Sequence, residues 1–334
     1  MSENVSAVQS AGPLARVRSS PGLVRNLGLI IALVLLCVVG AVTSGDQFVS
    51  SANLMVILSS AATIGIMSIG MTFVITGGGI DLSVGSMLGL ATVWATTLAT
   101  QTMAASSGWF VIAVTAVLVG AGVGLVNGII IAYGRVEAFI ATLAMMVGAR
   151  GLAEIISGRH TQLVDNDAFL DVFRADVLGV PAIVWMFLVV AVAGWFLLNR
   201  TTFGRRTIAV GGNPEAARLA GIKVKRHTMY LYALAGTTVG IAAITMLART
   251  RSGSSTNGTM YELDAIAAVV IGGTLLMGGR GTIFGTVLGV LIFSTLTNVF
   301  IQNNLSTSAQ SLVKGAIIVI AVLLQQRFAN RGSS

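Results

Sequence analysis

The chain has few charged residues, one cysteine and four prolines among its 334 positions. Charged residues make up 10% of the sequence, whereas soluble domains average about 25%. Because Cys37 is the single cysteine, the chain cannot form an intrachain disulfide or a cysteine-based metal cluster. The two histidines, His160 and His227, have no partner in a metal-binding or nucleophile pattern, so both are expected in loops.

Motifs for nucleotide hydrolysis and other common chemistries are also missing. The chain contains no G-x-x-x-x-G-K-[ST] phosphate loop, so it is not expected to bind or hydrolyse ATP itself. It contains no H-E-x-x-H, G-x-S-x-G or C-x-x-C sequence either. We therefore expect no catalytic residue, metal or cofactor in this chain. The net charge of +8 does not indicate a nucleic-acid partner, because the basic residues alternate with apolar spans instead of clustering beside aromatics.

Apolar residues are abundant instead, at 55% of the chain, and the mean hydropathy is +0.89. A membrane helix needs roughly 20 mostly apolar residues. The sequence therefore predicts an all-α polytopic membrane protein with about ten transmembrane helices. They are expected near residues 27–43, 54–75, 80–99, 109–133, 137–157, 179–198, 228–248, 263–278, 282–301 and 312–325. The segments 80–99 and 263–278 fit least well, because both are rich in glycine and polar atoms.

The distribution of charge predicts the orientation, since Lys and Arg accumulate in cytoplasmic loops. Fourteen of the twenty Lys and Arg residues fall on the side of the membrane that holds the N-terminus. Four aspartates fall in the loop 158–178 on the other side. We expect a multi-pass membrane protein, surrounded by lipid, with both termini cytoplasmic. Its parts would be a cytoplasmic tail over 1–26, a transmembrane domain over 27–325 and a second tail over 326–334. Residues 1 to about 20 are expected to be disordered.

Glycine spacing suggests an internal repeat. Gly120, Gly124 and Gly128 lie four residues apart in the fourth span, and Gly281, Gly285 and Gly289 do so in the ninth. Such stripes let helix backbones approach closely in lipid. The two helices are five spans apart and run in opposite directions, which predicts an inverted repeat of spans two to five and seven to ten.

Charged groups at membrane depth are functional candidates by default, and few occur here. Arg150 and Glu154 have the spacing of an ion pair on one helix face, which is the interpretation we prefer. Asp81 and Asp264 fall near the ends of their spans, where water is expected to reach them.

Two glycine clusters, "TGGGIDLSVGS" from Thr76 and "IGGTLLMGGRGT" from Ile271, are expected to interrupt helices. Interrupted helices at membrane depth expose backbone groups that can hydrogen-bond a polar solute, although close helix packing alone would also explain the glycines. The candidate solute path consists of Thr76, Gly77, Gly78, Gly79, Asp81, Ser83, Asn127, Phe139, Thr142, Gly272, Gly273 and Thr274.

The segment "RRTIAVGGNPEAARLAGIKVKRH", Arg205 to His227, lies in a basic loop over 199–227 that holds seven of the twenty Lys and Arg residues. Asn213 and Pro214 are a helix cap and a first helical residue, and Gly221 is a terminator. They predict a helix of about two turns with small side chains. A basic loop held by lipid phosphates would explain the charge but not this capped helix.

This loop resembles the permease subunits of bacterial monosaccharide ABC importers, the ribose-type group. Three more segments match: "IGMTFVITGGGIDLSVGSMLGL" from Ile69, "AFIATLAMMVGARGL" from Ala138 and "ELDAIAAVVIGGTLLMGGRGT" from Glu262. The similarity covers roughly residues 45 to 328. Two residues depart from the family pattern: Glu137 replaces a residue beside a proline at the start of the fifth span, and Glu154 stands where an apolar residue is commoner.

The resemblance implies a second permease subunit, the same or similar, a cytoplasmic ATPase that binds ATP and Mg, and an extracytoplasmic sugar-binding protein. A short helix of such permeases docks in a groove of the ATPase. Carried over, the ATPase-coupling residues are Arg205, Arg206, Gly212, Asn213, Glu215, Ala216, Ala217 and Gly221.

The function expected is import of a monosaccharide or related polyol by alternating access. The alternatives are an amino-acid ABC importer permease and an ion-coupled secondary transporter. The first would need charged groups for its zwitterionic substrate. The second would use a carboxylate such as that of Asp81 or Glu154.

Overall fold

The computed structural model describes residues 21–331, so the disorder expected for residues 1 to about 20 lies outside the described part. The helices are α2 (Pro21–Ser44), α3 (Asp46–Val49), α4 (Ser51–Thr76), α5 (Val84–Ala95), α6 (Leu98–Ser107), α7 (Phe110–Ala132), α8 (Ala138–Ser157), α9 (Asp167–Arg174), α10 (Ala182–Arg200), α11 (Thr202–Gly212), α12 (Pro214–Leu219), α13 (Val224–Thr250), α14 (Tyr261–Ile271), α15 (Ile283–Gln302) and α16 (Thr307–Arg331). Four two-residue strands form two antiparallel pairs: β1 (Gln162–Leu163) with β4 (Ser252–Gly253), and β2 (Asp176–Val177) with β3 (Val180–Pro181).

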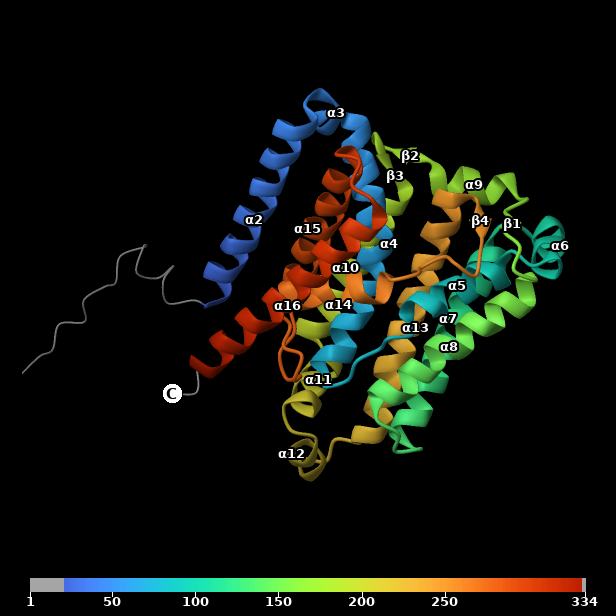
Figure 1. Cartoon of the computed structure of the whole chain (residues 1–334). Coiled ribbons are helices and arrows are strands. Elements are labelled where there is room, and N and C mark those ends of the chain that lie inside the picture. Colours follow the sequence, from blue (N-terminus) through green and yellow to red (C-terminus); the bar gives the residue numbers. More distant parts are fainter. Residues whose placement is uncertain (1–20, 332–334) are drawn as a thin grey trace, which may run out of the picture.

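The long helices run side by side as a bundle (Figure 1). One end carries α11 and α12 and is called the α12 end; the other carries α3, α9, β2 and β3 and is called the α9 end. Seven helices of the described part are long and apolar enough to cross a membrane: α4, α7, α8, α10, α13, α15 and residues Asn26–Ser44 of α2. The chain is therefore an all-α polytopic membrane protein.

Two of the expected spans contain only short helices, and a third is part of a longer helix than expected. The segment 80–99 holds the 12-residue α5 and the start of α6, and 263–278 holds α14, which ends at Ile271. Gly272 and Gly273 follow α14, and Gly273 has a φ of 88°, which favours glycine and ends the helix. The segment 312–325 lies within α16, which continues to Arg331, past the expected start of the C-terminal tail.

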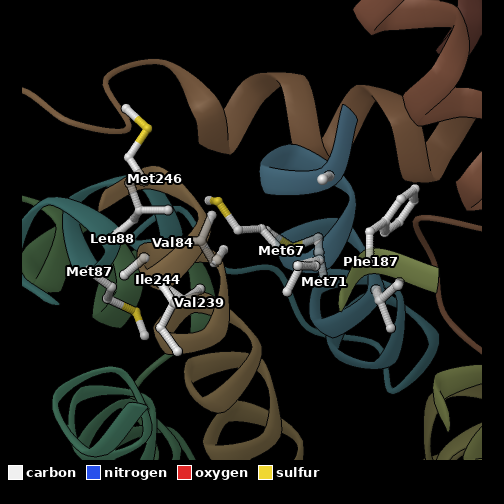
Figure 2. Packing of buried hydrophobic residues seen from close by; sticks show 14 of the residues in the cluster. Met67, Met71, Val84, Met87, Leu88, Phe187, Val239, Ile244 and Met246 are labelled. Carbon is white, nitrogen blue, oxygen red and sulfur yellow. The ribbon is translucent and has the colours of Figure 1, made fainter. Parts of the chain in front are cut away.

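Helices α4 and α13 occupy the centre of the bundle and pack against each other. Helix α13 also packs on α5 and α7, while α4 packs on α14 and α15. Figure 2 shows the core between them, where Met67 and Met71 of α4 lie between Phe187 of α10 and Val239 and Ile244 of α13. Helix α2 is peripheral and rests on α15.

The glycine stripe of α7 brings its backbone against that of α13. A methyl group added at Gly124 would lie 2.9 Å from the Gly236 Cα, and one added at Gly128 would lie 2.8 Å from the Met229 Cα. Gly281 precedes α15 and faces Thr76 at the end of α4, so the expected stripe continues in α15 only as Gly285 and Gly289. Gly289 contacts Ala268 of α14, and Gly285 contacts Gly272 directly after α14. Both stripes therefore serve close helix packing, as expected, but their partner helices are not equivalent positions of a repeat.

Candidate solute path and coupling helix

The predicted short helix of the basic loop is present as α12. The Asn213 side chain accepts a hydrogen bond of 3.0 Å from the Ala216 backbone N–H, Pro214 is the first helical residue, and Gly221 follows the helix with a φ of 83°. These are the cap, start and terminator that the sequence predicts. Glu215 pairs with Arg218 at 3.0 Å on the exposed surface.

Most of the predicted coupling residues are exposed at the α12 end. The side chains or backbones of Arg205, Arg206, Gly212, Asn213, Glu215, Ala216 and Gly221 are exposed, whereas Ala217 is buried and holds α12 on the bundle. The sequence reasoning missed Leu219, whose exposed fraction is 80%. A leucine on an otherwise polar and small-faced helix is the feature that distinguishes this position in the sequence.

Helix α11 connects α12 to the bundle. Thr207 of α11 hydrogen-bonds to the His227 ring at 2.9 Å, and the rings of Phe203 and His227 lie 4.7 Å apart. His227 is buried within α13, so its expected place in a loop was wrong. His160 does lie in a loop. Helix α13 begins at Val224, before the expected start of the span at residue 228, and this places His227 in the first turn of the helix.

Three glycine-containing segments meet at the α12 end, and we call this contact the glycine junction: residues 77–79, 211–212 and 278–279. The Gly279 N–H donates to the Thr76 carbonyl at 2.9 Å. A methyl group at Gly278 would lie 2.9 Å from the Gly78 Cα and 2.6 Å from the Gly211 carbonyl oxygen. The interruptions after α4 and α14 thus contact each other and the C-terminus of α11 through backbone atoms.

A cavity of about 260 Å³ lies beside the glycine junction. Its walls come from Gly77–Gly79, from Tyr232 of α13, from Pro214 of α12 and from Glu137 before α8. Glu137, one of the two departures from the family pattern, therefore faces the space between the helix interruption and α12.

Asp81, Ser83 and Asn127 form a fully buried polar cluster. The Asp81 Oδ1 accepts from the Ser83 backbone N–H at 2.9 Å and from its hydroxyl at 2.6 Å, and the Asn127 Nδ2 donates to the same hydroxyl at 2.9 Å. The Asp81 Oδ2 and the Asn127 Oδ1 have no hydrogen-bond partner among the described residues. The expected access of water to Asp81 was wrong, and the cluster presents two free acceptor oxygens inside the protein.

The other predicted path residues lie apart from this cluster. Thr142 is buried on α8 and donates to the Ala138 carbonyl at 2.8 Å, whereas Phe139 of the same helix is 54% exposed. Gly272, Gly273 and Thr274 form the turn after α14, and the Thr274 hydroxyl accepts from the Thr282 N–H at 3.3 Å. The structure thus distributes the path residues over four groups: Thr76 and Gly77–Gly79 at the glycine junction, the buried polar cluster, the α8 pair, and the turn after α14.

The charged groups of the spans have other partners than the expected ones. Glu154 pairs with Arg159 at 3.0 Å, and Arg150 instead donates to the carbonyls of Ser255 and Asn257. The expected pair of Arg150 and Glu154 was wrong. The reason is that the loop 252–259 folds back onto α8 and offers Arg150 buried carbonyls, while the turn after α8 returns Arg159 to Glu154.

Asp264 of α14 is bound to Lys314 of α16. The Lys314 Nζ lies 3.1 and 3.0 Å from the two carboxylate oxygens, and the two side chains are 12% and 19% exposed for Asp264 and Lys314. Asp264 is therefore paired and largely shielded from water, so the access of water expected at this position was wrong. In the part of the chain that the structure describes, no group of three His, Cys, Asp or Glu residues could hold a metal ion.

Apolar spanning helices, helix interruptions lined by glycine and polar groups buried between the helices define a membrane transport protein. A family described as the permease component of the branched-chain amino acid transport system matches residues 53–322, and the chain belongs to this family.

The chain is also similar to curated relatives along nearly its full length. It is 41% identical over 308 residues to a ribose import permease protein of Bacillus subtilis (92% of this chain, 94% of the relative) and 40% identical over 311 residues to that of Escherichia coli K12 (91% and 94%). It is 36% identical over 309 residues to an L-arabinose ABC transporter permease protein of Azospirillum brasilense (92% and 90%). No solved structure matches the chain.

Proposed function

We propose that the chain is the membrane-spanning permease subunit of an ATP-binding-cassette importer and carries a neutral monosaccharide or related polyol by alternating access. The observation that carries this proposal is the 41% identity to a ribose import permease over 92% of the chain. The groups at the helix interruptions agree with it, because hydroxyls, amides and backbone carbonyls can hydrogen-bond a sugar without a buried charge.

The family description favours an amino acid as the alternative substrate. A zwitterion needs a charged or helix-terminus partner for each of its two charges. The candidate path residues include one charged side chain, Asp81, which is already bonded to Ser83. The relatives with the sugar names therefore weigh more than the family description.

We assign the energy source to a separate cytoplasmic ATPase, which would bind ATP and Mg. The sequence contains no phosphate loop, and α12 offers a capped helix with Leu219 and Glu215 exposed at its surface. A second permease subunit, the same or similar, and an extracytoplasmic sugar-binding protein complete the proposed assembly. An ion-coupled secondary transporter is the remaining alternative, with Asp81 as its carboxylate, but it would leave α12 without a purpose.

The proposed topology has ten crossings of the bacterial inner membrane, both termini in the cytoplasm and the α12 end facing the ATPase. The short helices α5 and α14 would each complete a crossing together with the loops around them. The reciprocal packing of α4 on α14 and α15 and of α13 on α5 and α7 supports an inverted repeat of the two halves. The glycine stripes do not, since their partner helices differ.

Uptake in proteoliposomes tests this proposal. The chain is reconstituted with its ATPase and binding protein, and ATP-dependent uptake of radiolabelled D-ribose, L-arabinose and leucine is compared. We expect uptake of a sugar that stops without ATP. Uptake of leucine alone would support the amino-acid alternative, and uptake by the permease alone under an ion gradient would refute ATPase coupling.

The coupling helix has its own test. Replacing Leu219→Ser should remove most copurifying ATPase and lower uptake at least tenfold, because an exposed apolar anchor of an interface is lost. Leu98→Ser is the matched control, since Leu98 is 83% exposed on α6, away from α12. Equal effects of the two substitutions would contradict the docking role of α12.

A further inference from the structure

A cavity of about 400 Å³ opens at the α9 end of the bundle, opposite α12, and none of the predicted path residues lines it. Its walls come from α4, from α9 and β2, from the start of α10 and from the end of α13. The volume lies within the range of about 300–1,000 Å³ typical of small-molecule sites. The lining residues include Ser59, Phe173, Arg174, Asp176 and Arg249.

Three charged side chains line this cavity without forming ion pairs. Within residues 21–331, the ion pairs are Glu154 with Arg159, Glu215 with Arg218 and Asp264 with Lys314. Arg174, Asp176 and Arg249 belong to none of them. Guanidinium groups donate hydrogen bonds and a carboxylate accepts them, so the cavity offers both kinds of partner that a hydroxyl group can use.

Arg249 is held in place by neutral groups. Its Nη2 donates to the Ser60 hydroxyl at 2.8 Å and its Nη1 to the Thr63 hydroxyl at 3.3 Å, and Thr63 is further bonded to Thr245 at 2.9 Å. A guanidinium has five N–H donors, and these bonds use two of them. The remaining donors have no protein partner among the described residues and are available at the cavity wall.

Phe173 supplies a fixed apolar wall. Its ring packs edge-on against Trp109 at 5.4 Å and against the buried Phe169 at 4.9 Å. Two aromatic neighbours restrict the rotation of the ring, so it forms a preorganised surface for the C–H groups of a ligand. An apolar ring face beside charged hydrogen-bonding groups matches the amphipathic surface of a monosaccharide.

We propose that this cavity is a monosaccharide-binding site on the entry side of the permease, in which Arg174, Asp176 and Arg249 bind hydroxyl groups and Phe173 packs on the sugar ring. The proposal rests on the proposed function and names the site where the solute is first held. Two guanidiniums and one carboxylate also suit a zwitterionic amino acid, and the test below separates the two ligands.

The test measures protection of an introduced cysteine in the reconstituted full transporter. Cys37→Ala removes the single native cysteine, and Ser59→Cys then places one thiol in the cavity wall. Ser106→Cys is the matched control, because Ser106 is exposed on α6 and does not line the cavity. The rate of modification by a small, membrane-impermeant methanethiosulfonate is followed with and without D-ribose, L-arabinose or leucine.

We expect the transported sugar to slow modification at position 59 at least fivefold and to leave position 106 unchanged. Adding Asp176→Asn should raise the half-protecting sugar concentration about tenfold, as expected for loss of one charge-assisted hydrogen bond. Asp171→Asn, an exposed aspartate of α9 outside the cavity, should not. Equal protection at both cysteines, or protection by leucine alone, would overturn the site.

Uptake by the same Ser59→Cys protein separates this inference from the proposed function. ATP-driven sugar uptake without protection at position 59 would refute the cavity site and leave the importer assignment standing. Absence of uptake for every monosaccharide, in the native chain as well, would refute both.

Discussion

Replacing Lys314→Met leaves the carboxylate of Asp264 without its cation at a position where the aspartate side chain is only 12% exposed. Removing one partner of a buried ion pair costs about 3–5 kcal/mol, because the remaining charge keeps its desolvation cost and loses its attraction. The expected loss of unfolding free energy is therefore about 3–5 kcal/mol. The pair also joins α14 to α16, so the contact between these helices should loosen.

Arg159→Met is the control, because it breaks a pair of the same length at a very different exposure. The Glu154–Arg159 distance is 3.0 Å, as in the Asp264–Lys314 pair, but the Arg159 side chain is 81% exposed. Exposed pairs contribute about 0–1 kcal/mol. The double variant Asp264→Leu with Lys314→Met should recover most of the stability, since apolar residues of similar size can replace a buried pair at little cost.

Unfolding in mixed micelles of mild detergent and SDS provides the measurement, with the fluorescence of the four tryptophans as the signal. The free energies of the native chain, the two single variants and the double variant are compared. Equal losses for Lys314→Met and Arg159→Met, or a double variant no more stable than Lys314→Met, would refute the reasoning from burial.

Two further substitutions test the helix packing and the buried cluster. Gly124→Leu should lower the Tm of the detergent-solubilised chain by at least several degrees, because the leucine side chain would collide with the Gly236 backbone. Gly122 has open space around it, so Gly122→Leu should change the Tm little. A larger loss for Gly122→Leu than for Gly124→Leu would contradict the packing. Ser83→Ala removes the hydroxyl that donates to Asp81, so it should lower the unfolding free energy by about 1–3 kcal/mol and reduce sugar uptake. Unchanged uptake and stability would show that the cluster is dispensable.

Local signals in the sequence were sufficient for α12. The cap at Asn213, the proline after it and the glycine at 221 act within one short segment, so no distant contact was needed to predict the helix. The positions of the main apolar helices were likewise predictable, because each depends on its own run of apolar residues.

The partners of charged and polar groups were not predictable in the same way. Arg150 could not be assigned correctly from its spacing to Glu154, because its acceptors lie more than a hundred residues away in the loop 252–259. The cavity at the α9 end is also not predictable from the sequence, since Ser59, Phe173 and Arg249 come together only when α4, α9 and α13 pack. Contacts between distant segments determine these sites, and a single sequence does not encode them in any local pattern.

The glycine junction has no side chain that could absorb a displacement. Where two helices meet through side chains, a rotamer change can take up part of a movement before the backbones respond. At Gly78, Gly211 and Gly278 the backbones themselves are in contact. A shift of α11 caused by a partner at α12 would therefore move the interruptions after α4 and α14 together and by a similar amount. The two halves of the bundle would then move as one rigid unit at this end.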